Sequence, residues 1–116
     1  MNDDDVVRAL AALAQPSRLQ IFRSLVVAGS QGMTPTALSE ALRLPGTSLS
    51  FHLKELSRAR LITQERQGRY LIYRALYSTM NEVLAYLTLN CCDGQPCELR
   101  ELNFVETGAS PCRPLP

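Results

Sequence analysis

Two helical patterns separated by only Pro45-Gly46 place the strongest constraint on the fold of this chain. Residues 34–44, TPTALSEALRL, place Thr34 as a helix N-cap and Pro35 at the first helical position. Residues 47–60, TSLSFHLKELSRAR, resume the helical pattern with leucines at i, i+4 and i+7. Because Pro-Gly favours a turn, we expect two short helices that follow each other within a few residues.

The next stretch, LITQERQGRYLIYR at residues 61–74, has two runs rich in Ile, Tyr and Thr on either side of Gln67-Gly68-Arg69. This pattern predicts a β-hairpin with a basic tip. Two helices, a tight turn and such a hairpin, in this order, predict a winged helix-turn-helix whose recognition helix is residues 47–60. The expected fold class is mainly α with a β-hairpin, with about five helices and two strands.

Three further helical patterns complete this fold, at residues 3–15, 16–29 and 77–90. Acids at the start of the first helix and a proline at the start of the second suit helix N-termini. In the first pattern, apolar residues stand near helical spacing at Val6, Val7, Leu10, Leu13 and Ala14. In the second, one face carries Leu19, Phe22, Leu25 and Val26. In the helix before the turn, the residues predicted to point inward are Leu38, Ala41 and Leu42.

The last helical pattern is unusually wide on its apolar side. Tyr77, Met80, Val83, Leu84 and Leu87 stand at helical spacing, and Tyr86 and Leu89 extend the apolar surface beyond one stripe. One core cannot cover so wide a face, so we expect a second partner there.

The domain organisation follows from length and composition. The 116 residues are about one domain's worth, and 46% apolar with 20% charged residues is ordinary for a folded protein. We expect one domain over residues 1–90 and a partly flexible, cysteine-containing tail over residues 91–116, where glycines and prolines leave no regular period. The chain shows neither a secretory signal pattern nor an apolar run of about 18 residues, so we expect a cytoplasmic protein without a membrane partner.

The net charge of +1 conceals a strongly basic middle. Residues 43–74 hold seven basic and two acidic residues, a net charge of +5, while acidic residues gather at the start and around the tail. Such a segment indicates a surface that faces a polyanion, although a solvated charged face would have the same composition.

A helical projection of residues 47–60 helps to distinguish a DNA-facing surface from a solvated charged face. Leu49, Leu53 and Leu56 converge on one side, and the opposite side carries Thr47, Phe51, Lys54 and Arg58. A phenylalanine is unusual on a solvent-facing side but suits a major groove, where it contacts thymine methyl groups. We therefore predict base contacts from Thr47, Ser48 and Phe51, and phosphate contacts from Lys54 and Arg58.

His52 and the hairpin tip complete the predicted DNA surface. His52, the single histidine, borders the apolar side of its helix, which favours a packed or phosphate-contacting role over a metal ligand. Arg66, Gln67 and Arg69 are placed to reach phosphates or the minor groove, although a merely soluble hairpin tip has the same composition.

Two long runs resemble the arsenic-repressor (ArsR) family of bacterial winged-helix metalloregulators. They are ALAQPSRLQIFRSL and TALSEALRLPGTSLSFHLKELSRARLITQERQGRYLIYR, and the resemblance extends over about residues 6–90. It implies a homodimer that pairs through its first and last helices. It also implies a repressor that binds a palindromic operator on double-stranded DNA and leaves it when an inducer binds.

The inducer site is predicted from the cysteines. The founding ArsR pattern has cysteines on the helix before the recognition helix, and zinc-sensing relatives have Asp and His on the last helix; this chain has neither. Cys91, Cys92 and Cys97 instead resemble a subset of arsenic repressors with a CC-x4-or-5-C site just past the last helix. Three soft thiolates suit three-coordinate As(III) or Sb(III), whereas tetrahedral zinc needs a fourth ligand.

Alternatives remain open for these thiols. Cys112 could complete a four-sulfur Zn(II) or Cd(II) site or be idle, and a thiol-redox switch would use the same residues. A thiol reductase is disfavoured, because Cys91 and Cys92 follow a helix C-terminus and have acidic neighbours, which oppose a reactive thiolate. We expect no enzymatic activity and no permanent cofactor.

Overall fold

The computed structural model describes residues 1–89, of which Met1–Tyr86 form one packed unit. Its elements are α1 (Asp3–Leu13), α2 (Pro16–Ala28), the short 3-10 helix η1 (Gly29–Gln31), α3 (Pro35–Leu42), α4 (Gly46–Arg58), β1 (Ile62–Gln67), β2 (Tyr70–Ala75) and α5 (Tyr77–Leu87). The predicted fold class, five helices with one antiparallel hairpin, is confirmed within this range. The predicted cysteine tail lies outside the described residues.

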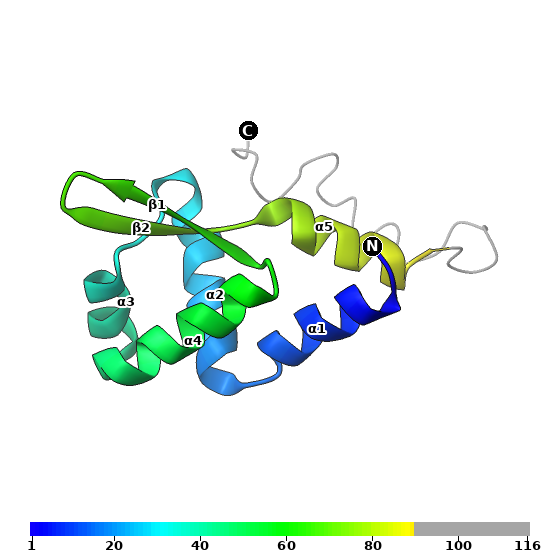
Figure 1. The fold of residues 1–116 in the computed structure, drawn as a ribbon, viewed down its shortest axis with the longest axis horizontal. Coiled ribbons are helices and arrows are strands. Elements are labelled where there is room, and N and C mark those ends of the chain that lie inside the picture. The colour runs from blue at the N-terminus through cyan, green and yellow to red at the C-terminus, as the bar shows by residue number, and fades with distance from the viewer. Residues whose placement is uncertain (90–116) are drawn as a thin grey trace. The chain divides into compact units, whose positions relative to one another are not determined.

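The hairpin and the α3–α4 pair lie together at one end of this unit, and α1 and α5 lie toward the other (Figure 1). α2 packs against α1, α3, α4 and β2, so it is the central helix. No helix among residues 1–89 is long and apolar enough to cross a membrane.

Side-chain caps fix where the helices begin. The Thr34 hydroxyl accepts a hydrogen bond from the Ala37 backbone N–H at 3.1 Å, as predicted for the start of α3. At α1 the cap is Asn2, whose side chain accepts from the Asp5 N–H at 2.9 Å while the Asp5 carboxylate accepts from the Asn2 N–H at 3.4 Å. This reciprocal capping box satisfies backbone N–H groups at the start of α1 and so fixes the residue at which the helix begins.

The core gathers around the inner side of α4. Leu49, Leu53 and Leu56 are each at most 3% exposed, as predicted. The remaining large, fully buried side chains are Ile21, Leu25, Leu38, Leu61 and Val83, which come from α2, α3, the α4–β1 connection and α5. Burial of a large aliphatic side chain contributes about 1.5–3 kcal/mol, so these layers hold α4 in place.

The apolar faces that helical spacing indicates are only partly buried, and the inward prediction for Ala41 is wrong. Val7, Leu10, Ala14, Leu19 and Ala41 are exposed. On α1 the buried positions are Val6, Ala9 and Ala12, because small alanines permit close approach to α2 and α4. On α2, Leu19 is exposed and Ile21 is fully buried.

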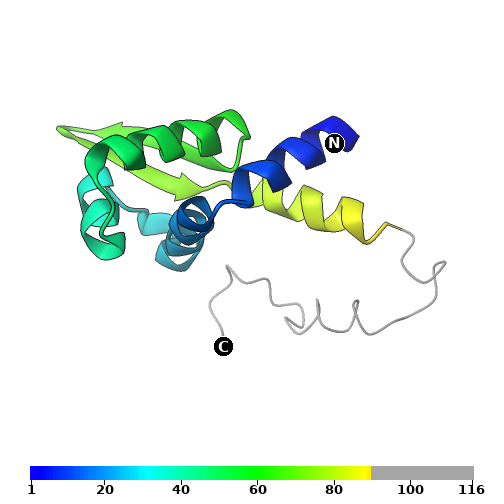
Figure 2. The same ribbon diagram turned by 90° about the horizontal axis from the view of Figure 1, so that it is seen from below.

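The predicted hairpin is present, but its tip has two residues, Gly68 and Arg69, because Gln67, predicted to belong to the tip, is the last residue of β1. β1 and β2 pair antiparallel from Ile62–Ala75 to Gln67–Tyr70, and Gly68 has a φ of 62°, the left-handed value that a type II′ turn needs at its first central residue. An isolated antiparallel β-bridge joins Met33, in the loop after η1, to Tyr73 on β2. The two ribbons of the hairpin extend beside α4 in the view from below (Figure 2).

Candidate nucleic-acid interface

The outer side of α4 carries polar, cationic and aromatic side chains together. Thr47, Phe51, Lys54 and Arg58 are exposed, and Phe51 is 56% exposed although it is a large apolar residue. Ser48 is only half-buried, whereas Ser50 is exposed and was not among the predicted contacts. Helical projection places Ser50 about as far from the buried leucines as Ser48, so exposure alone separates the two.

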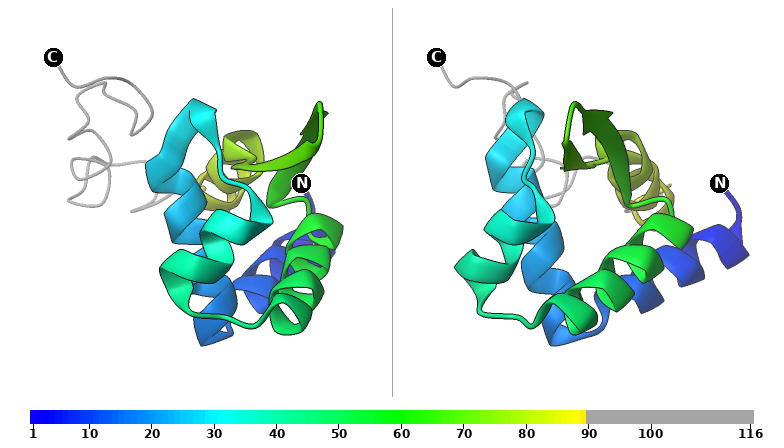
Figure 3. Two further views of the ribbon diagram at one scale, coloured as in Figure 1. Left: turned by 90° about the vertical axis from the view of Figure 1, so that its left-hand side faces the viewer. Right: turned by 60° about the vertical axis from the view of Figure 1, so that its left-hand side comes forward.

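The connection between α3 and α4 is held by its own hydrogen bonds. Arg43 ends α3 in the left-handed conformation with φ of 55°, and the Leu44 N–H donates to the Ser39 carbonyl at 3.1 Å. The Ser39 hydroxyl donates back to the Leu44 carbonyl at 2.6 Å. The turn is therefore made by Arg43 and Leu44; Pro45 is the N-cap residue of α4, and Gly46, predicted to lie in the turn, is the first residue of that helix. Figure 3 shows α3 and α4 as neighbouring helices joined by this short connection.

His52 makes two contacts at the edge of this surface. Its Nδ1 lies 3.4 Å from Arg18 Nη1, and its ring meets the Phe51 ring edge-on with centroids 5.7 Å apart. Burial lowers the pKa of His52 below 6.5, and the positive charge of Arg18 lowers this pKa further. These contacts are compatible with either half of the prediction for His52, a packed or a phosphate-contacting role, because the ring is only half-buried. No group of three potential metal ligands from His, Cys, Asp or Glu occurs within residues 1–89.

Arg18 is the residue that sequence reasoning missed. Its Nε donates to the Ala12 carbonyl at 2.7 Å, and its backbone N–H donates to the Gln15 side chain at 2.8 Å. It thus joins the end of α1 to α4. In the sequence, Arg18 stands out only as part of the Pro16-Ser17-Arg18 start of α2 that carries the family resemblance.

The hairpin tip presents Arg66, Gln67 and Arg69, all exposed. Behind them, Glu65 accepts from Arg74 Nη1 at 2.6 Å and from Gln67 Nε2 at 3.3 Å. The hydrogen bond from Arg74, and to a smaller extent the one from Gln67, lowers the pKa of Glu65 below 4.5. Arg74 Nε also donates to the Ser30 carbonyl at 2.7 Å, which ties the hairpin to η1.

Both acids of the basic segment are neutralised by neighbouring arginines. Glu65 pairs with Arg74, and Glu55 pairs with Arg58 at 3.1 Å. Within residues 1–89, the cations of this segment that form no ion pair are Arg43, Lys54, Arg60, Arg66 and Arg69. Arg58, predicted to contact phosphate, is therefore already paired with Glu55 in the free protein.

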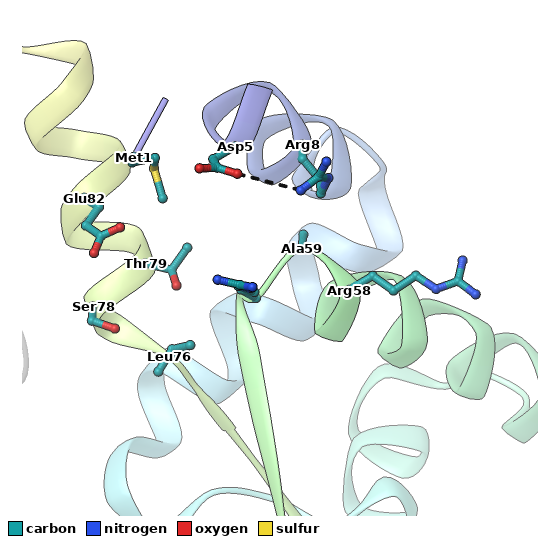
Figure 4. A pocket seen from close by; sticks show the side chains of 10 residues that line it. Met1, Asp5, Arg8, Arg58, Ala59, Leu76, Ser78, Thr79 and Glu82 are labelled. Atoms are coloured by element: carbon teal, nitrogen blue, oxygen red, sulfur yellow. Dashed lines mark ion pairs between the residues drawn. The ribbon is translucent and has the colours of Figure 1, made fainter. Parts of the chain in front are cut away.

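A separate pocket of about 250 Å³ opens between α1, the end of α4 and the start of α5 (Figure 4). Its walls carry both charges: Asp5 and Arg8 form an ion pair at 3.7 Å, and Glu82 and Arg58 also line it. The predicted metal ligands Cys91, Cys92 and Cys97 lie outside the described residues.

Comparisons with known proteins agree with this geometry. Residues 13–65 match the family described as a helix-turn-helix domain. Among solved structures, the chain is similar to an ArsR-like transcriptional regulator from Rhodococcus sp. RHA1, with 22% identity, a TM-score of 0.69 and coverage of 92% of this chain and 94% of that one. A comparison with curated proteins finds no match.

Two further structures are similar. NolR from Sinorhizobium fredii has 27% identity and a TM-score of 0.60, with 73% of this chain and 82% of that chain covered. A homodimeric winged helix-turn-helix DNA-binding domain from Mycobacterium bovis, a possible ArsR-family regulator, has 23% identity and a TM-score of 0.60, with 84% and 96% covered. The chain is thus a winged helix-turn-helix protein, a class that transcriptional regulators use to bind DNA.

Proposed function

We propose that this chain is an ArsR-family repressor that binds operator DNA as a homodimer and leaves it when As(III) or Sb(III) binds Cys91, Cys92 and Cys97. The observation that carries the DNA-binding part is the outer side of α4, where Phe51 is exposed between Thr47 and Lys54 on a helix held by a tight turn.

The residues of α4 and the hairpin divide the work of DNA binding. Thr47, Ser48 and Phe51 near the start of α4 contact base edges, and Phe51 supplies the apolar contact that a thymine methyl group accepts. Lys54, Arg58 and His52 contact phosphates, which fix the register of the helix in the groove. Arg66, Gln67 and Arg69 at the hairpin tip reach the adjacent backbone or minor groove.

Exposed apolar side chains on two helices support the homodimer. α1 exposes Val7 and Leu10, and α5 exposes Tyr86 and Leu87. A second copy of the chain would cover these side chains, and the similar domain from Mycobacterium bovis is homodimeric. A two-fold dimer presents two recognition helices about 34 Å apart, one turn of DNA, which matches a palindromic operator.

The choice of inducer rests on ligand chemistry. Three thiolates without an imidazole suit As(III) or Sb(III) better than zinc. Binding would tie residues 91–97 together next to the last helix and thereby alter the spacing of the two recognition helices. Zn(II), Cd(II) or thiol oxidation at the same cysteines, with or without Cys112, is the second candidate, favoured only by the presence of a fourth sulfur.

The test is fluorescence anisotropy with a duplex that carries the DNA upstream of the protein's own gene. We expect two chains per duplex and an affinity that falls steeply with salt. Lys54→Gln should weaken binding to all sequences and reduce the salt slope by about 1, while Arg23→Gln on the exposed side of α2 should change neither. Absence of any preference for this duplex over random DNA would contradict the repressor function. Titration of the bound complex with As(III), Zn(II), Cd(II) and peroxide then identifies the inducer.

A further inference from the structure

We propose that Arg18 is a positioning residue that holds His52 in its Nε2–H tautomer, so that the imidazole offers an N–H donor to a DNA phosphate. This inference rests on the DNA binding proposed above and adds to it a named donor atom and the residue that sets it.

Arg18 is itself held on two sides. Its Nε donates to the Ala12 carbonyl at 2.7 Å, and its backbone N–H is capped by the Gln15 side chain at 2.8 Å. The Gln15 contact fixes the backbone of Arg18, and the Nε hydrogen bond orients the guanidinium, because its donors form a rigid fork. The remaining arm places Nη1 at 3.4 Å from His52 Nδ1.

The tautomer follows from the chemistry of the two groups. A guanidinium has only donors and stays protonated in proteins. A hydrogen bond between Arg18 Nη1 and His52 Nδ1 therefore requires Nδ1 to be the acceptor, without a proton. In a neutral imidazole the single proton then sits on Nε2. The lowered pKa of His52, caused by burial and then by the Arg18 charge, agrees with a neutral ring at pH 7.

Nε2 has no hydrogen-bond partner among residues 1–89, although Nδ1 has one. The ring lies on α4 directly beside the exposed Phe51 and is kept at an angle of 63° to the Phe51 ring. A phosphate oxygen only accepts hydrogen bonds, so it matches an Nε2–H and rejects an unprotonated nitrogen. Arg18 thus decides whether this edge of α4 attracts or repels the DNA backbone.

The single histidine makes the tautomer directly measurable. Long-range ¹H–¹⁵N NMR of the free full-length protein at neutral pH should show one imidazole with the proton on Nε2. Arg18→Met, which keeps an apolar stem but removes the donor, should yield a mixture of tautomers, and Arg23→Met on the same helix should not. A wild-type ring protonated on Nδ1, or a tautomer ratio that Arg18→Met leaves unchanged, would overturn the proposal. If Arg18→Met does not fold, Arg18→Leu, which also lacks the donor, takes its place under the same criterion, because neutral histidine favours Nε2–H in water and the wild-type spectrum alone does not isolate the effect of Arg18.

Operator affinity tests the DNA contact separately. His52→Gln places its amide nitrogen near the position of Nε2 and should retain most of the affinity, whereas His52→Asn, whose amide reaches only the position of Nδ1, should lose about 10- to 100-fold, the factor for one charge-assisted hydrogen bond. Equal affinities of His52→Asn and wild type would overturn the phosphate contact. A wild-type protein that does not bind its upstream DNA would contradict the proposed function instead. The NMR result depends only on the free protein, so the two failures are distinguishable.

Discussion

A Cβ atom on Gly32 would stand 2.5 Å from the carbonyl oxygen of Tyr73, closer than real side chains approach a backbone oxygen. Gly32 also has a φ of 66°, and the residue after it bridges to Tyr73 through hydrogen bonds of 3.0 and 2.8 Å. The loop after η1 is therefore fitted directly against β2, the strand that supports the hairpin tip.

Gly32→Ala should destabilise the protein by more than the roughly 1–3 kcal/mol that a strained backbone conformation alone costs. Gly29→Ala is the matched control, because Gly29 has the same φ of 66° but nothing within 4 Å of its added Cβ. The free energy of unfolding from urea titrations should be lower for Gly32→Ala than for Gly29→Ala. Equal losses would mean that the contact with β2 relaxes without cost.

Phe51→Ala should weaken operator binding while leaving stability nearly unchanged, because the side chain is 56% exposed and contributes little to the core. We expect a loss similar to that of one mismatched base pair in a specific site, about 1–3 kcal/mol. Anisotropy with operator and random duplexes should show that most of the loss falls on the operator. Val27→Ala, an exposed apolar residue on α2, serves as the control. An equal loss on both duplexes would remove Phe51 from base recognition.

The ion pair between Glu65 and Arg74 should make stability depend on acid pH. The Arg74 hydrogen bond is the main cause that lowers the pKa of Glu65 below 4.5 in the folded protein. Between the folded-state pKa and 4.5, the pKa of the unfolded chain, the unfolded chain therefore binds more protons than the folded protein. The stabilisation is present above 4.5 and is lost as the pH falls through the folded-state pKa. Wild type should therefore lose more stability than Glu65→Gln on acidification. Parallel pH profiles for the two proteins would contradict this assignment.

Leu10→Glu should separate the dimer into monomers, because it places a charge among the exposed apolar side chains of α1. Leu19→Glu is a close control, since Leu19 on α2 is 45% exposed and Leu10 is 42% exposed. Sedimentation velocity should show a concentration-dependent shift to monomer for Leu10→Glu only. A dimer that survives Leu10→Glu would exclude this side of α1 from the interface.

The fold was predictable where local chemistry alone decides it. Thr34 with Pro35, the three leucines of α4 and Gly68 each specify one local geometry, and the structure has all three. The exposure of Leu10 and Leu19 was not predictable, because periodicity shows that a side is apolar but not which neighbour covers it. The alanines at positions 9 and 12 carry a weak hydrophobic signal, yet close helix contact buries them.

The exposure of the candidate-site residues was predictable, but the contacts between them were not. The exposure of Phe51 and Lys54 follows from a helical projection of one segment. The contact of Arg18 with His52 joins residues 34 positions apart, and no local pattern gives the distance between their nitrogens. The pairing of Glu65 with Arg74 likewise depends on the hairpin register.

The most direct measurement of the central claim is the anisotropy of the reduced protein on its upstream duplex during titration with arsenite. Wild type should lose about 5- to 150-fold in affinity, the range of a typical allosteric coupling, and the variant with Ser at positions 91, 92 and 97 should bind DNA equally well without responding. A wild-type protein that stays bound at saturating arsenite, with its thiols shown to be reduced, would contradict the account.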